Sequence, residues 1–105
     1  MRIDVEVTTD ARLELLAIVS SKLPDEGDAV RFAALYVEDM VKQFQAAEGP
    51  PPASDARRGS HGTIWWKFAD GIWANYSVAT RGSRLLGGVR RTITVFGFEE
   101  NPPGR

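Results

Sequence analysis

The chain has 105 residues, of which 43% are hydrophobic and 26% are charged, as expected for one soluble globular domain over residues 1–105. It has no cysteine, which excludes disulfides, thiol nucleophiles and thiolate metal sites, and its single histidine argues against a histidine-based zinc site. No segment approaches the roughly 20 apolar residues of a membrane span, and the N-terminus lacks the apolar run of a signal peptide. We therefore expect a cytoplasmic protein that binds no membrane, metal or other cofactor.

The net charge of −1 conceals an asymmetry between the two halves of the chain. Residues 1–50 carry five Lys/Arg and ten Asp/Glu, a net charge of −5, whereas residues 51–105 carry eight and four, a net charge of +4. Positive charge gathered in one half favours an anionic partner there. The alternative interpretation, that these charges belong to an ordinary solvated surface, has equal weight, because dedicated nucleic-acid-binding domains are usually more basic than this.

The first half of the sequence predicts one strand and two helices. Residues 2–8 alternate between polar and apolar side chains, which is the period of a half-buried strand. Good helix formers with an apolar stripe predict a helix over residues 11–22, ended by Leu23-Pro24. A second helix is predicted from about residue 25 to Ala47, before Gly49 and three prolines. Its apolar stripe consists of Val30, Ala33, Ala34, Val37, Met40 or Val41, and Phe44.

The second half predicts a connector and three strands. Residues 49–62 are polar and rich in glycine and proline, as expected for a long connector. Asp70-Gly71 then separates two strand-like runs within residues 63–79, which is a hairpin signal. A long turn is predicted over residues 81–89 and a third strand over residues 91–98.

Together these elements predict a two-layer α+β domain in the order β-α-α-β-β-β. A helical hairpin is expected to pack on a small, mainly antiparallel sheet, in which the first strand pairs with one of the last three. We expect the tail, residues 101–105, to be flexible and to add no structure.

No catalytic motif is present, since the sequence has no P-loop, dinucleotide fingerprint, HExxH or nucleophile elbow. The aromatic residues of the strands allow two interpretations. Trp65 and Trp73 either lie on the outer face of the sheet, where a nucleobase stacks on them, or belong to the core. We favour the core, because the helices cover one face of the sheet and aromatic side chains fill that layer.

Three segments of the second half carry a resemblance to a known family. They are Ile64-Trp65-Trp66-Lys67-Phe68, Gly71-Ile72-Trp73-Ala74-Asn75-Tyr76 and Ile93-Thr94-Val95-Phe96-Gly97-Phe98, the last followed by Asn101-Pro102-Pro103. Together with the order of the elements, they resemble the RelE/ParE toxin superfamily, and most closely its HigB-like branch. The resemblance spans residues 1 to about 103.

The resemblance implies a toxin-like component of a type II toxin–antitoxin system, bound by a small antitoxin protein. RelE- and HigB-like members cut ribosome-bound mRNA without a metal, as the ribose 2′-hydroxyl attacks the adjacent phosphate. We therefore predict an endoribonuclease. Its predicted catalytic residues are Lys67, Arg81, Arg84 and His61, the only imidazole, which suits acid–base work near neutrality. Its predicted RNA-binding residues are Arg57, Arg58, Arg90 and Arg91.

Two departures from the family pattern favour a different class of function. Ala74 and Asn75 stand where the family often has an arginine. Glu99 and Glu100 stand where lysines are common, and they would repel RNA phosphates. Both favour a non-catalytic protein-interaction module of the same fold, whose sheet groove binds a protein segment. A ParE-like toxin directed at DNA gyrase is a further alternative, and a small-molecule-binding domain would require a well-formed enclosed pocket.

Overall fold

The structure is a computed structural model that describes residues 2–46, 56–69, 71–83 and 88–100. Its elements are, in order, β1 (Arg2–Val7), α1 (Thr9–Ser20), α2 (Glu26–Ala46), β2 (Ala56–Arg58), a short 3-10 turn η2 (Ser60–Gly62), β3 (Ile64–Ala69), β4 (Ile72–Ser83) and β5 (Gly88–Glu99). The strands form one sheet in the order β1-β5-β4-β3-β2. β1 runs parallel to β5, and every other pair of neighbours is antiparallel.

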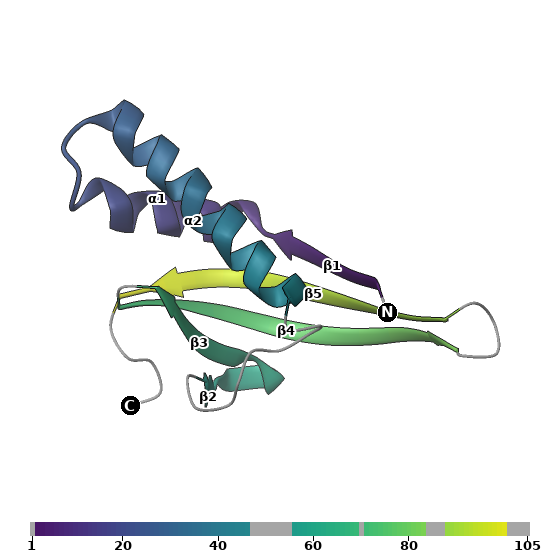
Figure 1. The fold of residues 1–105 in the computed structure, drawn as a ribbon. Helices are drawn as coiled ribbons and strands as arrows, with labels where there is room; N and C mark the ends of the chain where they lie inside the picture. Colours follow the sequence, from purple (N-terminus) through teal and green to yellow (C-terminus); the bar gives the residue numbers. More distant parts are fainter. Residues whose placement is uncertain (1, 47–55, 70, 84–87, 101–105) are drawn as a thin grey trace.

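Both helices lie on the same side of the sheet (Figure 1). We call the side that the helices cover the inner face and the opposite side the outer face. The α+β class, the mainly antiparallel sheet and the pairing of the first strand with a strand of the second half are therefore confirmed.

The connector predicted over residues 49–62 contains two elements that the sequence did not predict. β2 pairs antiparallel with β3, with Arg57 opposite Trp65, and η2 follows it. A polar segment forms an edge strand here because the pairing uses backbone hydrogen bonds and leaves the side chains free to be polar. The part of the connector from residue 49 to residue 55 lies outside the described residues.

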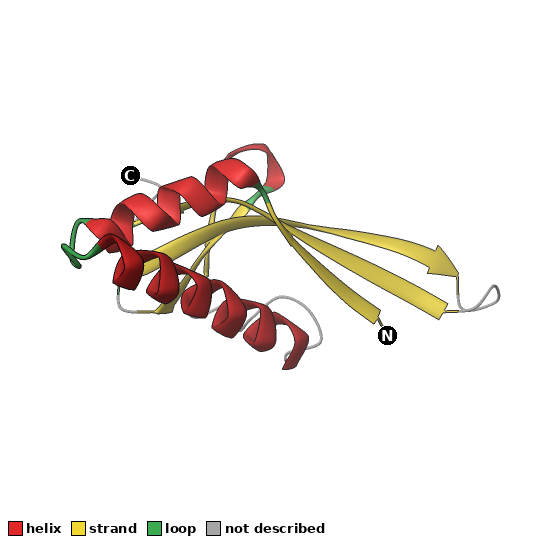
Figure 2. Cartoon of the chain, turned by 90° about the horizontal axis from the view of Figure 1, so that it is seen from above, coloured by secondary structure: helices red, strands yellow, loops and turns green. Residues whose placement is uncertain are grey.

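The long turn predicted over residues 81–89 is wrong at both ends. β4 continues to Ser83 and β5 begins at Gly88, and these two residues are partners in the ladder. The glycines that suggested a turn are accommodated within the strands, where Gly82 and Gly88 have φ angles of 101° and 105°. The two strands consequently form a long ribbon that extends past the helices (Figure 2). Arg84 and the tail, residues 101–105, lie outside the described residues.

The core lies between the helices and the inner face of the sheet. α1 contributes Ala11, Leu15 and Val19, and α2 contributes Ala29, Met40 and Phe44. The predicted stripe of α2 is correct at Met40 and Phe44, but Val30 is 56% exposed, because Ala29 occupies the buried position at that end of the helix.

An aromatic cluster fastens α2 to the sheet. The Phe44 ring lies 5.0 Å, centroid to centroid, from both Trp66 on β3 and Tyr76 on β4, with edge-to-face geometry in each case. Phe68 continues the cluster at 5.8 Å from Trp66 and 5.7 Å from Phe98 on β5. Pairs of this kind contribute about 0.5–1.5 kcal/mol each beyond the area that they bury.

We predict that Phe44→Ala lowers the free energy of unfolding by about 3–5 kcal/mol, because it removes two ring contacts and leaves a cavity. The matched control on the same helix is Phe32→Ala, since Phe32 is 46% exposed. That control should change the free energy by about 0.5 kcal/mol or less. Urea unfolding followed by circular dichroism measures both, and equal losses would contradict the placement of Phe44 in the core.

Burial raises the pKa of Tyr76 to about 12, because the charged phenolate is poorly solvated in the core. The unfolded chain releases this proton near pH 10, whereas the folded chain keeps it. Stability should therefore be unaffected by Tyr76 below pH 10 and fall between pH 10 and 12, by on the order of 2 kcal/mol. Urea unfolding at a series of pH values measures the decline, which Tyr76→Phe should reduce. An equal decline in that variant would contradict the assignment.

Candidate functional site

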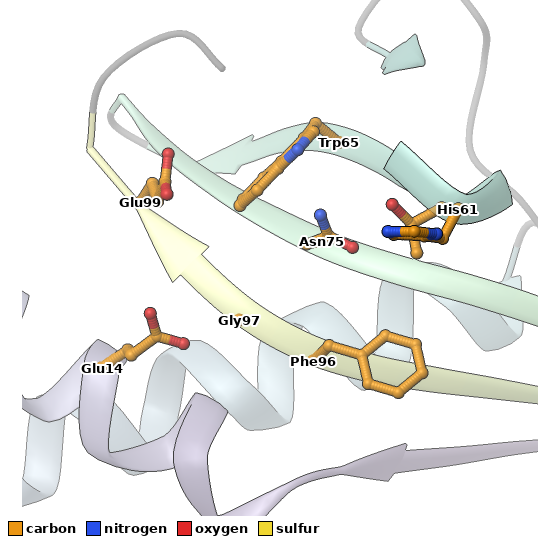
Figure 3. Close-up of a pocket in the computed structure, with 8 residues that line it drawn as sticks. Glu14, His61, Trp65, Asn75, Phe96, Gly97 and Glu99 are labelled. Atoms are coloured by element: carbon orange, nitrogen blue, oxygen red, sulfur yellow. The ribbon is translucent and has the colours of Figure 1, made fainter. Parts of the chain in front are cut away.

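The outer face of the sheet carries an open hollow with a volume of about 310 Å³. Its lining residues are Glu14, His61, Thr63, Trp65, Asn75, Phe96, Gly97 and Glu99. They come from α1, from the loop before β3 and from the last three strands (Figure 3). The hollow thus joins segments that are far apart in the sequence.

A bulge in β5 shapes the hollow. Asn75 pairs with Gly97 and Tyr76 pairs with Val95, so Phe96 is an extra residue on β5 without a partner on β4. Its ring is 45% exposed and lies at the side of the hollow, while Gly97 leaves the neighbouring position without a side chain. The bulge therefore places an aromatic side chain at the side of the hollow, and Gly97 beside it leaves the base of the hollow open.

α1 brings a carboxylate to this floor. β1 ends at Val7, opposite Val95, so the last residues of β5 have no partner in β1. α1 follows at once, because the Thr8 N–H donates to the Val95 carbonyl and the Thr8 hydroxyl accepts from the Ala11 N–H, capping the helix. The helix packs against β5 and directs Glu14 into the space above Gly97.

Two carboxylates consequently lie close together. A Glu14 oxygen lies 2.8 Å from the position that a Cβ on Gly97 would occupy. Glu99 is two residues along the same face of β5, which is about 7 Å further. Neither glutamate has an ion pair with a described residue, whereas Glu100 on the same strand end forms one with Lys22 at 3.2 Å.

The loop before β3 places His61 at the rim. The Gly59 N–H donates to the Thr63 carbonyl at 2.8 Å and closes a tight turn. Within it His61 has a φ of 56°, a left-handed conformation that few residues other than glycine adopt. The turn packs closely on β3, since a Cβ on Gly59 would lie 2.6 Å from Thr63 Oγ1 and 3.1 Å from Trp65 Cδ1.

The three tryptophans have three different environments. Trp66 is 3% exposed and belongs to the hydrophobic core. Trp65 is half-buried and lines the hollow, so the prediction that it belongs to the core is wrong. Trp73 is 6% exposed yet stands outside the core cluster, in register with Lys67 and Glu99. Alternation along β3 explains the difference, because adjacent residues point to opposite faces.

Asn75 contributes a buried polar atom to the hollow. Its Oδ1 atom is fully buried and accepts no hydrogen bond from any described residue. An unsatisfied buried acceptor costs about 1–3 kcal/mol. The side-chain amide turns about a soft torsion, which can direct this oxygen towards the hollow. A donor bound there would satisfy it.

The structure brings only part of the predicted catalytic set to this site. His61 lines the hollow, and Lys67 is exposed on the outer face, two residues along β3 from Trp65. Arg81 is exposed on the ribbon, six residues along β4 from Asn75, or about 20 Å away. Arg84, the fourth member, lies outside the described residues.

Of the predicted RNA-binding arginines whose side chains the structure describes, Arg58, Arg90 and Arg91, none lines the hollow. Arg57 and Arg58 stand on β2, in register with Trp65 and Ile64. Arg90 faces Arg81 across the ribbon and forms an exposed ion pair with Asp4 at 3.6 Å, and Arg91 is half-buried. The positive charge of the second half is therefore spread over two regions of the sheet.

Sequence reasoning missed several residues of the hollow. Glu99 and Asn75 were noted only as departures from a family pattern, and Phe96 and Gly97 only as part of its last motif. A glycine inside a strand is a recognised sign of a bulge, which could have indicated Gly97. Glu14 carries no such signal, because only the packing of α1 against β5 brings it here.

Within the described residues, no cluster of three or more His, Asp or Glu side chains is arranged to hold a metal ion. Neither described helix is long and apolar enough to cross a membrane. Comparisons of the chain with protein-family models, with curated proteins and with solved structures gave no match. A function must therefore be proposed from the fold, the hollow and the family resemblance.

Two glycines of the site should respond differently to the same substitution. Gly59→Ala should destabilise the protein by about 1–3 kcal/mol, because its methyl group meets the start of β3. Gly97→Ala should change the free energy of unfolding by about 0.5 kcal/mol or less, because the nearest atoms to the new methyl group belong to the flexible end of Glu14. Urea unfolding measures both, and an equal cost for the two would contradict the described packing.

Proposed function

We propose that the protein is an interaction module that binds a positively charged segment of a partner protein in the outer-face hollow. The partner proposed is the small antitoxin of a type II toxin–antitoxin pair, in which this chain is the toxin-like component. The observation that carries the proposal is the lining itself. Its described residues include two carboxylates and a buried, unsatisfied amide oxygen, and no lysine or arginine is among them.

The charges of the hollow favour a cation over a phosphate. A phosphate about 7 Å from one carboxylate is repelled by about 2 kcal/mol at an effective dielectric constant of 20, and the second carboxylate adds to this. A cation at the same place is attracted by a similar amount. Of the predicted phosphate-binding arginines, Arg81 and Arg90 lie about 20 Å away on the ribbon. Arg57 and Arg58 lie on β2, beside β3.

The toxin–antitoxin part of the proposal is supported by the resemblance to RelE/ParE toxins and by the order of the elements. A strand, a helical hairpin, a connector and a three-stranded unit follow one another, with β2 as an addition in the connector. The three segments that carry the resemblance are β3, β4 and β5, and their outer faces form the hollow.

An endoribonuclease acting on ribosome-bound mRNA is the second candidate, which the position of His61 favours. His61 lines the hollow, and Lys67 is exposed on the same face, two residues along β3 from Trp65. An imidazole could transfer a proton there, and an ammonium could bind a phosphate. The gyrase-directed alternative stays a prediction, since no feature of the hollow favours it.

Partner capture tests the proposal. We predict that Glu14→Gln with Glu99→Gln lowers the capture of the proposed antitoxin by at least about tenfold, because the charges that attract its cationic segment are removed. Glu38→Gln with Asp39→Asn, two exposed carboxylates on α2, is the matched control and should retain capture. Purified proteins measured by titration calorimetry give both affinities.

Two results would contradict the proposal. One is unchanged affinity in the Glu14/Glu99 variant together with loss of affinity in Phe32→Ser with Leu35→Ser, which would place the partner on the exposed apolar surface of α2. The other is cleavage of ribosome-bound mRNA that disappears in His61→Ala and Lys67→Ala. That result would establish the second candidate instead.

A further inference from the structure

We infer that the group received by the hollow is the guanidinium of an arginine side chain. The inference rests on the proposed function and names the chemistry by which the partner is recognised. It is carried by three properties of the lining: paired carboxylates, an unsatisfied acceptor beside them, and two aromatic walls.

The two carboxylates determine the charge of the ligand and how many hydrogen-bond donors it needs. Glu14 and Glu99 lie on either side of the bare backbone at Gly97, and an ionised carboxylate only accepts hydrogen bonds. A guanidinium offers five N–H donors in a rigid plane, so a single group can bond both carboxylates at once. An ammonium is compact and strongly hydrated, and its point charge meets two separate carboxylates less well.

Lys67, which is exposed on the same face, does not satisfy these carboxylates. Lys67 stands in the same row as Trp73 and Glu99, two strands from Glu99, which is about 10 Å across the sheet. Its side chain is exposed and forms no ion pair with Glu99. The negative charge of the hollow is thus available to an external cation.

The aromatic walls favour a planar cation. Trp65 on β3 and Phe96 on β5 lie on opposite sides of Asn75 (Figure 3). An indole face attracts a guanidinium by cation–π interaction and by stacking, with about 0.5–2 kcal/mol for a partly exposed site. Asn75 lies between the walls, and rotation of its amide would turn the unsatisfied Oδ1 acceptor towards a remaining N–H.

A nucleobase could stack on the same aromatic residues, but the phosphate attached to it does not suit the negative charge of the hollow. Guanine also donates to a carboxylate from its Watson–Crick edge, and it stacks on indole rings. The phosphate of the nucleotide would then approach the second carboxylate, which repels it. The observations therefore favour a protein side chain over a nucleotide.

Blocked single amino acids test the inference on the full chain. The probes are N-acetyl-arginine amide, N-acetyl-lysine amide, N-acetyl-citrulline amide and guanosine monophosphate. ¹H–¹⁵N spectra follow the Trp65 indole N–H, assigned with Trp65→Phe, and the Asn75 amide. We expect saturable shifts of both signals with the arginine probe, about fivefold weaker binding of the lysine probe and no saturable binding of citrulline, which lacks the charge.

Variants locate the binding. Glu14→Gln with Glu99→Gln should weaken the arginine probe by at least about tenfold, since two charge-assisted contacts are lost. Glu38→Gln with Asp39→Asn should leave it unchanged. Trp65→Leu should weaken it about threefold while the protein stays folded, which the dispersion of the spectrum reports.

The inference is overturned if arginine and citrulline bind alike, if guanosine monophosphate shifts the same signals more strongly than arginine, or if arginine shifts nothing at its highest soluble concentration. Its failure is separable from failure of the proposed function. If the partner's affinity depends on Glu14 and Glu99 while the arginine probe shifts nothing, the proposed function stands and the arginine inference falls.

Discussion

The pairing of β4 with β5 is the interaction on which the rest of the structure depends. β4 and β5 are twelve-residue strands at the centre of the sheet; β3 pairs with β4, and β1 pairs with β5. A regular ladder would give each strand two uniform faces. The extra residue at Phe96 breaks this uniformity at one place, so that Val95 and Phe98 both reach the core while Gly97 opens the outer face. The core and the hollow thus share one backbone irregularity.

The sheet also separates two kinds of surface. At one end the helices, the bulge and the loop around His61 build a hollow with two unmatched carboxylates. At the other end, the ribbon carries Arg81 and Arg90, opposite each other in the ladder. A rigid sheet holds these ends about 20 Å apart, so they do not act on one small group. A large partner could contact both ends, with its cationic segment in the hollow and its acidic groups on the ribbon.

Sequence reasoning was most successful where local periodicity decides the structure. The period of β1, the Asp70-Gly71 hairpin and the spacing of Met40 and Phe44 are properties of short segments, and they gave the α+β class. It failed where backbone pairing or packing decides. Ala56–Arg58 forms a strand only because β3 offers an edge, and the glycines near residues 82 and 88 continue the ribbon instead of ending it. Glu14 joins the site only because β1 ends opposite Val95, two residues before Gly97, and α1 follows there.

The aromatic residues alone do not decide between the two candidate functions, because an indole face stacks on a nucleobase or on a guanidinium with similar energy. Trp65 would therefore suit either ligand. The charged positions around it discriminate: arginine or lysine in place of Asn75 and Glu99 would make the hollow attract phosphate, whereas the residues present attract a cation. The class of ligand therefore depends on the charged residues around Trp65, which a pattern of apolar and polar residues along the sequence does not reveal.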